Sequence, residues 1–380
     1  MTGLDWLQAL RPSLDLDLDP NLWAGWQRLD AALDDVAVGD PGPGDPAARS
    51  RWLRRVRTQL STHHGSGLWQ AGAQFLAGYR DLDLREATGT GHGQMILDHA
   101  PGPLARSWAD RLARGALVGI AATEAHGGSR IQEITTTAHP LPGGLWRVSG
   151  SKCWVSRLTE SDAFVVFLRD PAGTISAVVI DATAPGLVRE PRTPSGLGGW
   201  SWGMLTFDAV DVDPTTQLIG EAGQGLRIFR EHFTRFRPLV TLCALGTAAS
   251  VHDRVRGLLA DRSARGVIPR IRDNALIALG SAWAQINAAT LLALHATHPD
   301  SHDLAARLGK AHGVDTACRT TEALAPLVGA VGFQHDHPIA KARTDLAALQ
   351  YADGIHDSLY RSGGAELLRA ATGRPRLQAA

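Results

Sequence analysis

Cysteine is scarce in this chain of 380 residues, which contains only Cys153, Cys243 and Cys318. The three are widely separated and odd in number, so they predict neither a disulfide framework nor a thiolate metal site. Each is expected to be a small buried apolar residue. Free cysteines of this kind fit a reducing compartment, and we expect the protein to be cytoplasmic.

Net charge and long hydrophobic runs are absent as well. The 38 lysines and arginines balance the 38 aspartates and glutamates, so no net field favours nucleic acid or an anionic membrane. No apolar stretch reaches the roughly 18 uninterrupted residues of a membrane span. The first residues, MTGLDWLQALRPSLDLDLDP, carry acids where a signal peptide needs a basic flank. We therefore expect a soluble globular protein with neither nucleic acid nor membrane as a partner.

Metal-site patterns are also missing. Histidines lie close together in HDHP (335–338) and in STHHG (61–65). Neither pair has the helical i,i+4 spacing and the third ligand of a zinc site. No metal is expected.

The pattern of hydrophobic and turn-forming residues changes at two places, which divides the sequence into residues 1–118, 119–216 and 217–380. In the first segment Leu, Ile and Val recur mostly every three or four residues, which indicates helices, and a glycine- and proline-rich loop interrupts them at 39–48. In the second, short runs such as AFVVFLRD and TISAVVID are separated by turn signals, which favours a small antiparallel barrel or sandwich. The predicted class is α+β, and the third segment is helical.

Four long helical runs with short connectors make up that third segment and predict an antiparallel four-helix bundle. The last run, PIAKARTDLAALQYADGIHDSLYR (338–361), contains the pair Asp353-Gly354. Glycine inside a helix costs roughly 1 kcal/mol relative to alanine, so another requirement is expected to favour it there. Asp353 is either an ordinary solvated acid on a helix surface or a carboxylate directed at a substrate.

Two short motifs surround the first predicted strands, IAATEAHGGSR (120–130) and SGSKCWVSR (149–157). Taken alone, the first is either a surface turn or a loop whose backbone amides face a flavin ring or a phosphate. Together the two motifs resemble the acyl-CoA dehydrogenase flavoprotein family, which has Thr-Glu-Pro and a Gly-Ser pair, then Gly-x-Lys-x-Trp-Ile-Thr. The stretch LTFDAVDVDPTTQLIGEAGQGLRIF (205–229) is similar to the family's Phe-x-x-Val-x-Val-Pro strand and glycine-rich turn. The resemblance covers roughly residues 85–370 and includes the helix–strand–helix order.

The resemblance implies that the cofactor is FAD. Ala122 and Thr123 would then bond the flavin pyrimidine edge, Trp154 would pack against the isoalloxazine, and Ser156 would stand where a threonine bonds the flavin. Trp154 has a second interpretation as a half-buried aromatic residue of a sheet. The implied flavin contacts are Ala122, Thr123, Gly128, Ser129, Trp154, Ser156, Arg262, Gly329 and Ile355.

The bundle segment also resembles the family, with departures. In DRSARG, Arg262 would reach the flavin pyrophosphate of a neighbouring subunit, which implies a homotetramer or homodimer. Arg265 stands where the family has phenylalanine, Pro326 replaces a glutamine near Gly329, and Asp273 stands where glutamine is usual. These departures leave open weaker FAD binding or a shifted pose.

The family's catalytic Glu-Gly falls on Asp353-Gly354, so the resemblance implies that Asp353 is the base. In some members the base precedes an arginine of the first bundle helix, but here Phe236 precedes Arg237 and offers no carboxylate. Gly354 would let the backbone approach a thioester closely. The residues implied to bind substrate are Ser129, Gly354, Phe236 and Arg237.

The function implied by the resemblance is FAD-dependent α,β-dehydrogenation of an acyl thioester. A base removes the proton from Cα while flavin N5 takes a hydride from Cβ. The carrier would be coenzyme A or an acyl-carrier protein, in secondary metabolism, with a flavoprotein or oxygen as electron acceptor. Two alternatives stay open: a flavin monooxygenase of the N-hydroxylating kind on the same fold, and a non-catalytic member that has lost FAD.

Overall fold

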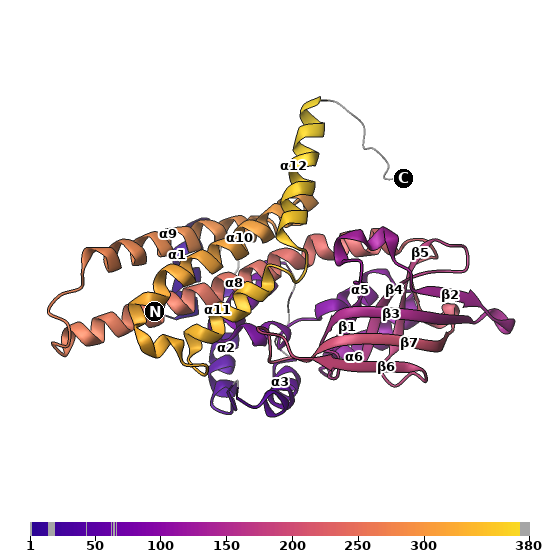
Figure 1. The fold of residues 1–380 in the computed structure, drawn as a ribbon, viewed down its shortest axis with the longest axis horizontal. Coiled ribbons are helices and arrows are strands. Elements are labelled where there is room, and N and C mark those ends of the chain that lie inside the picture. Colours follow the sequence, from indigo (N-terminus) through magenta and orange to yellow (C-terminus); the bar gives the residue numbers. More distant parts are fainter. Residues whose placement is uncertain are drawn as a thin grey trace.

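The structure is a computed structural model, and it describes residues 2–13, 20–42, 44–61, 63, 65 and 67–372. A helical part comes first, followed by a sheet and then by a bundle of long helices, with the sheet and the bundle at opposite ends of the molecule (Figure 1). The first α-helices are α1 (Gly3–Leu10), α2 (Pro20–Ala37), α3 (Pro46–Leu60), α4 (Leu68–Arg80), α5 (Gln94–His99) and α6 (Gly102–Ala113). Between them stand the short 3-10 helices η1 (Arg11–Ser13), η3 (Leu82–Glu86) and η4 (Gly91–Gly93). Helix α3 begins inside the predicted loop, because Asp45 caps the backbone N–H of Ala48 and Pro46 occupies its first turn.

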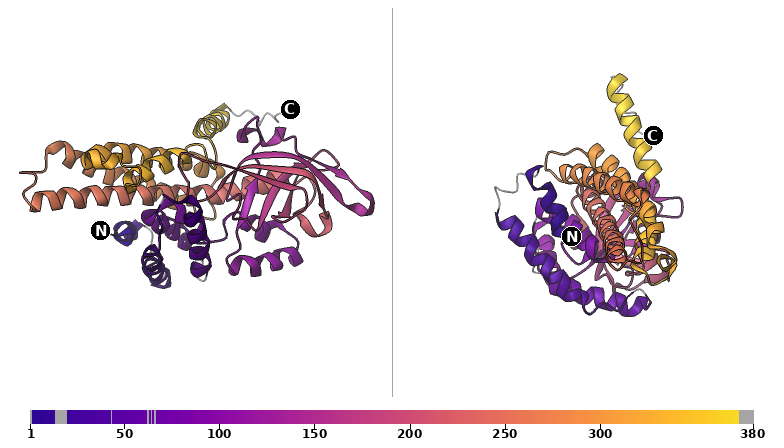
Figure 2. Two further views of the ribbon diagram at one scale, coloured as in Figure 1. Left: turned by 60° about the horizontal axis from the view of Figure 1, so that its bottom comes forward. Right: turned by 90° about the vertical axis from the view of Figure 1, so that its left-hand side faces the viewer.

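The N-terminal helices lie along one side of the bundle (Figure 2). Helix α4 crosses α8 (Gly225–Ala264) at very short range because both contribute a glycine. A Cβ at Gly78 would lie 1.9 Å from the carbonyl oxygen of Cys243, and one at Gly246 would lie 2.1 Å from that of Phe75. The hydroxyl of Thr247 donates to the carbonyl of Gly78 at 2.9 Å. Glycine at these two positions therefore fixes the α4 part of the chain against the bundle.

The central part is one eight-stranded sheet. Its strands are β1 (Val118–Ala121), β2 (Thr137–Pro140), β3 (Trp146–Ser156), β4 (Ala163–Arg169), β5 (Ile175–Asp181), β6 (Leu187–Arg192), β7 (Trp202–Val212) and β8 (Leu218–Ile219). The order is β6-β7-β3-β2-β4-β5-β8, with β1 paired to β4. The pairings are antiparallel except β1 with β4 and β2 with β4. The predicted antiparallel domain thus contains two parallel pairings.

Both faces of the sheet are covered, which explains why β4 is apolar along its whole length. Phe164 and Val166 point into a core formed with strands such as β3 and β7. Val165 and Phe167 point to the other face and pack with residues of α5, α6 and the start of the long helix α8, among them Trp108. An 11-residue strand β3 runs through this sheet and carries the second sequence motif to the side facing the bundle.

The C-terminal part consists of α8 (Gly225–Ala264), α9 (Asp273–His295), α10 (Asp303–Leu324), α11 (Pro338–Leu349) and α12 (His356–Thr372), with the short α7 (Pro214–Gln217) before them. Two 3-10 turns, η7 (Ala325–Val328) and η8 (Ala330–Phe333), follow α10. Helix α8 has 40 residues and is about 60 Å long. It runs from the sheet to the far end of the bundle and so connects the two (Figure 1).

The predicted continuous helix over 338–361 is wrong. Helix α11 ends at Leu349, and α12 begins at His356 and stands away from the bundle (Figures 1 and 2). The break lies at Asp353 (φ 55°) and Gly354 (φ 117°), two consecutive residues with positive φ. A helix cannot pass through two such residues, so the glycine serves a turn between two helices.

Helix α9 is, among the described residues, the one helix whose length and composition would allow it to cross a membrane. Of its most apolar segment, 33% is buried within this chain, and core helices of soluble proteins can be equally long and apolar. It packs against α8 and α10 and leaves Leu276, Ile277, Trp283 and Leu292 exposed.

Candidate functional site

A bulge in β3 sets the directions of the second motif's side chains. The register between β3 and β7 shifts between Lys152 and Val155. Within the bulge Trp154 has φ 57°, and just after it Arg157 has φ 55°. The indole of Trp154 is 65% exposed, whereas Lys152 and Arg157 are buried. Bulges and strained residues cluster at functional sites because they redirect side chains, so the end of β3 is a candidate for one.

A buried ion pair attaches the first motif to this strand. Lys152 donates to Glu124 at 2.8 Å, and the backbone N–H of Cys153 donates to the carbonyl of Thr123 at 2.9 Å. Glu124 also accepts from the backbone and hydroxyls of Thr135 and Thr136. The pair therefore fixes the 122–128 loop beside the bulge.

The pKa values of this pair show that it is ionised at neutral pH. Burial alone would raise the pKa of Glu124, but the hydrogen bonds from Lys152, Thr135 and Thr136 hold it at about 2. Burial lowers the pKa of Lys152 to about 8, with Glu124 acting to raise it. Removing one partner would leave the other charge buried and unpaired.

Replacing Glu124 by glutamine should lower the free energy of unfolding by about 3–5 kcal/mol, because buried Lys152 would lose the carboxylate that compensates for its burial. Because the pKa of Glu124 is lowered from 4.5 to about 2 on folding, its contribution is present above pH 4.5 and is lost as the pH falls toward 2. The wild-type advantage over the variant should shrink in that window. Urea unfolding across the window measures both effects.

Glu133 provides the matched control, because its ion pair with Arg130 lies on the surface. The side chain of Glu133 is 59% exposed and that of Arg130 is 63% exposed. Glu133→Gln should change the free energy of unfolding by less than about 1 kcal/mol. An equal effect of both substitutions would contradict the structural role assigned to Glu124.

A buried lysine of α10 stabilises the turn that carries Asp353. The ammonium of Lys310 donates to the carbonyls of Leu349, Ala352 and Gly354, each at 2.7 Å. Burial lowers the pKa of Lys310 to about 7, with the charge of Asp353 acting to raise it. Three hydrogen bonds from one side chain define the path of the turn, which leaves Asp353 half-buried and outside any helix.

Three elements meet at Asp353. Arg237 of α8 donates from Nε to the carbonyl of Asp353 at 3.2 Å. The charge of Asp353 acts to raise the pKa of Arg157 at the end of β3 and that of Arg237, although burial lowers both. The α11–α12 turn accordingly lies where the bundle meets the sheet (Figure 1). A carboxylate is thus placed opposite the motif-bearing end of β3.

A pair of neutral histidines lies in the same region. His92 Nδ1 and His232 Nε2 are 2.9 Å apart, and the ring of Phe236 lies 4.7 Å and 5.1 Å from the two imidazoles. Burial lowers the pKa of His92 well below its usual value and that of His232 to about 3. Both rings are therefore uncharged at neutral pH, and one of the two facing nitrogens donates a hydrogen bond to the other.

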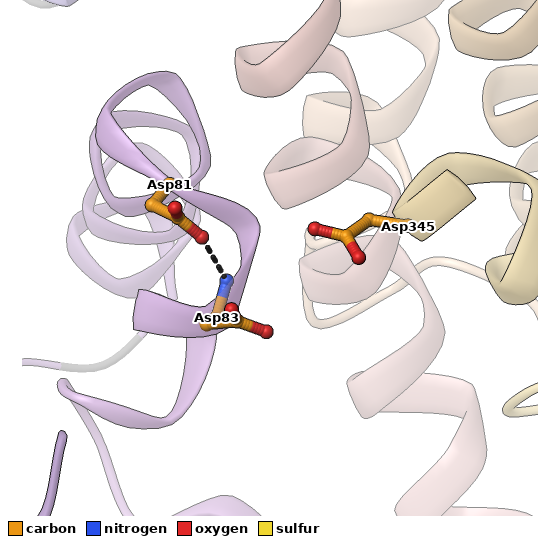
Figure 3. Close-up of side chains that lie close together, drawn as sticks. All are labelled: Asp81, Asp83 and Asp345. Atoms are coloured by element: carbon orange, nitrogen blue, oxygen red, sulfur yellow. Dashed lines mark hydrogen bonds between the residues drawn. The ribbon is translucent and has the colours of Figure 1, made fainter. Parts of the chain in front are cut away.

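Three acids also converge elsewhere, between η3 and α11: Asp81, Asp83 and Asp345 (Figure 3). The ammonium of Lys341 lies 2.7, 2.9 and 2.5 Å from their respective oxygens, and Arg49 pairs with Asp81 and Asp83. Burial would raise the pKa of Asp83, but these cations hold it at about 2. Because the lysine already occupies the centre, the cluster joins the N-terminal helices to the bundle and offers no cation site.

The structure divides the sequence-derived site residues into three groups. Ala122, Thr123, Gly128, Trp154 and Ser156 lie on the loop and strand described above. Phe236, Arg237, Gly354 and Ile355 lie with Asp353 at the α8 and α11–α12 side. The side chain of Ser129 lies outside what the structure describes.

A third group, Arg262 and Gly329, lies at the far end of the bundle. Arg262 donates to the carbonyl of Val328, next to Gly329, whose φ is 83°. Arg262 is 25 residues beyond Arg237 on α8, which is about 37 Å along the helix. One chain therefore does not bring Arg262 and Gly329 to the Trp154 side.

Sequence reasoning missed Lys310, Arg157 and the two histidines. Arg157 is the last residue of the second motif, and its position there was the one available signal. Lys310 is one of few lysines in the sequence, but its partners are at least 39 residues away. His92 and His232 are separated by 140 residues and meet only in the folded chain.

Comparison with known proteins identifies the family. Residues 119–210 match the model of the acyl-CoA dehydrogenase middle domain, and residues 223–368 match that of its C-terminal domain. The chain belongs to the acyl-CoA dehydrogenase family. The two matches cover the sheet with the Trp154 strand and the bundle with the Asp353 turn, and together they include more than half of the chain.

Individual acyl-CoA dehydrogenase relatives are distant. A Mycobacterium bovis protein named "Probable acyl-CoA dehydrogenase fadE25" is 25% identical over 64% of this chain and 65% of its own length. The human mitochondrial very long-chain specific acyl-CoA dehydrogenase is 24% identical over 62% of this chain and 38% of its own length. The chain thus spans less than two thirds of these curated relatives.

Solved structures show the same fold over nearly the whole chain. Butyryl-CoA dehydrogenase from Megasphaera elsdenii has a TM-score of 0.77 at 19% identity, covering 91% of this chain and 98% of its own. PigA with FAD and proline has a TM-score of 0.77 at 15% identity, covering 92% and 98%. At these identities the similarity establishes the acyl-CoA dehydrogenase fold.

Proposed function

We propose that this protein is an FAD-dependent acyl-CoA dehydrogenase that oxidises the Cα–Cβ bond of an acyl thioester, with Asp353 as the base. The observation that carries the proposal is the placement of Asp353. It stands on a strained turn that Lys310 and Arg237 hold in position, opposite the end of β3 that carries the exposed Trp154. Family membership supports the oxidoreductase class.

The residues at the sheet end fit a flavin ring. The indole of Trp154 offers an exposed aromatic face, and Thr123 offers a hydroxyl beside it on the linked loop. A Cβ at Gly128 would lie 2.8 Å from the hydroxyl oxygen of Thr123, so glycine keeps that hydroxyl unobstructed. Trp154, Thr123 and the backbone of Ala122 would hold the ring. FAD, when bound, would accept the hydride that leaves Cβ.

The chain's own residues account for the proton transfer. Asp353 would remove the α-proton as a general base. Gly354, which follows it with φ 117°, would let the substrate carbonyl approach the backbone closely. Aspartate is one methylene shorter than glutamate, and the hydrogen bonds from Lys310 and Arg237 to the turn would compensate by fixing where the shorter side chain starts.

A second copy of the chain would complete the cofactor site. Arg262 and Gly329 lie about 37 Å along α8 from Arg237, so they would act on the FAD of another subunit. The exposed apolar side chains Leu276, Ile277 and Trp283 of α9 offer a surface for assembly into a homodimer or homotetramer. We expect a cytoplasmic enzyme that transfers its electrons to a flavoprotein or to oxygen, with an acyl group on coenzyme A or on a carrier protein of secondary metabolism.

Product analysis tests the proposed reaction. Purified protein supplied with FAD, an artificial electron acceptor and a series of saturated acyl-CoA thioesters should yield an enoyl thioester lighter than the substrate by two hydrogen atoms. A product that has gained oxygen, formed only with reduced flavin and oxygen, would instead establish a monooxygenase. Protein that takes up no FAD and alters no thioester would indicate the non-catalytic alternative.

A further inference from the structure

Arg157 is a buried cation with unused hydrogen-bond donors. The residue is 1% exposed, and it takes a left-handed backbone conformation (φ 55°) at the end of β3. Its Nη1 donates to Glu86 in a short ion pair. Its Nε and Nη2 have no partner among the described residues, although both atoms are shielded from solvent. Buried polar groups are nearly always hydrogen-bonded, so two free donors on one guanidinium require an explanation.

The surroundings of Arg157 contain more positive than negative buried charge. Arg85 lies 3.7 Å from the same Glu86 and also has an unpartnered nitrogen, Nη1. Arg57 donates to backbone carbonyls, among them that of Glu86, and so neutralises no carboxylate there. Three buried arginines therefore share a single buried carboxylate. An arrangement with surplus buried charge is costly unless another anion joins it.

The free donors belong to the region of the Asp353 turn. Arg157 lies within electrostatic reach of Asp353, His92 and His232. The two histidines are neutral and add no negative charge, so beyond Glu86 only the partly exposed Asp353 and Glu160 offset the cation. Asp353 is half-buried, as is Phe236, which contacts both histidines. These two partly exposed residues mark the side from which we expect a ligand to approach the guanidinium.

We propose that Arg157 binds a carboxylate carried on the acyl chain of the substrate, so that the substrates are thioesters of dicarboxylic acids. The free Nε–H and Nη2–H lie along one edge of a planar guanidinium, which is the geometry that accepts both oxygens of a carboxylate. Arg85 supports the same anion through its free Nη1. This inference rests on the proposed function for the thioester end of the ligand, but the binding of the carboxylate is a separate property of the site.

Paired substrates test this proposal. The probes are a dicarboxylic acyl thioester of N-acetylcysteamine and its methyl ester at the distal carboxylate, neither of which contains phosphate. Wild-type protein should favour the free carboxylate in kcat/KM by at least about 100-fold, since a site built to bond a polar group rejects the analogue that lacks it. Arg157→Gln should abolish that preference by raising KM for the carboxylate and leaving the ester unaffected. Equal use of both probes by wild-type protein would overturn the proposal.

A binding measurement separates this inference from the proposed reaction. The carboxylate probe should raise the Tm of the FAD-loaded wild-type protein more than the ester does, whether or not either probe is oxidised. If the carboxylate probe raises the Tm more than the ester does but neither probe is oxidised, the proposed dehydrogenation would be wrong and the proposed carboxylate site would stand. Arg157→Lys serves as the second variant if Arg157→Gln does not fold. It keeps the positive charge but loses the paired guanidinium donors, so it should fold and retain part of the preference for the carboxylate probe. If substitution weakens FAD binding and both probes alike, Arg157 serves the cofactor and the proposal is wrong.

Discussion

Replacing Asp353 by asparagine should lower kcat for acyl-thioester oxidation by about 100- to 10,000-fold, the range that a positioned general base contributes. Asparagine tolerates the left-handed conformation that Asp353 adopts at φ 55°, so the turn should keep its shape. The amide cannot accept the α-proton. The FAD content of the variant should therefore match that of the wild type, its Tm should fall only slightly through the lost charge beside Lys310, and steady-state kinetics should show the loss in kcat.

Asp357 is the control for this substitution, because it is an exposed acid four residues further on, in the first turn of α12. Asp357→Asn should leave kcat unchanged within twofold or so. If Asp353→Asn also retained full turnover, the base would have to be sought elsewhere, and the interpretation of Asp353 as an ordinary surface acid would hold.

Replacing Lys310 by methionine should have the second largest effect, and it should act on stability and on rate together. The substitution leaves the carbonyls of Leu349, Ala352 and Gly354 without their common donor. Each unsatisfied buried group costs about 1–3 kcal/mol, and the bonds to Ala352 and Gly354 are only partly buried, so we expect a loss of roughly 3–6 kcal/mol in unfolding free energy. A shift of the turn by about 1 Å would also cost about 100-fold in kcat. Urea unfolding and steady-state kinetics measure the two losses.

Arg319→Met is the matched control on the same helix. Arg319 is exposed, and its guanidinium makes a 3.4 Å contact with the hydroxyl of Thr316. Its removal should change the unfolding free energy by no more than about 0.5 kcal/mol and leave kcat intact. Loss of stability without loss of rate in Lys310→Met would show that the lysine supports the fold without positioning Asp353.

The order of helices and strands could be predicted from the sequence, because that order depends on local patterns. Short β-branched and aromatic runs between turn signals predicted strands where β4 and β5 lie, and the glycine-proline stretch predicted the break before α3. The motif around Trp154 pointed to the strand that the structure shows to be bulged. Both kinds of signal are contained within about ten neighbouring residues.

The parts that could not be predicted depend on contacts between distant segments. Residues 338–361 have a helical pattern throughout, and the break at Asp353 is stabilised by Lys310, which lies 43 residues earlier in the chain. The burial of Arg157 depends on Glu86, 71 residues away. Parallel pairing of β1 with β4 likewise joins strands that are not consecutive. Spacing along the chain contains no information about such partners.

Anaerobic reduction of the bound cofactor is the most direct test of the central claim that Asp353 and the Trp154 strand enclose a reacting acyl thioester. A saturated acyl thioester is added to the FAD-loaded protein without oxygen or any other reductant, and the visible absorption of the flavin is followed. Wild-type protein should bleach, and Asp353→Asn should bleach at least about 100-fold more slowly. Wild-type protein that stays oxidised with every thioester tried, or a variant that bleaches equally fast, would contradict the account.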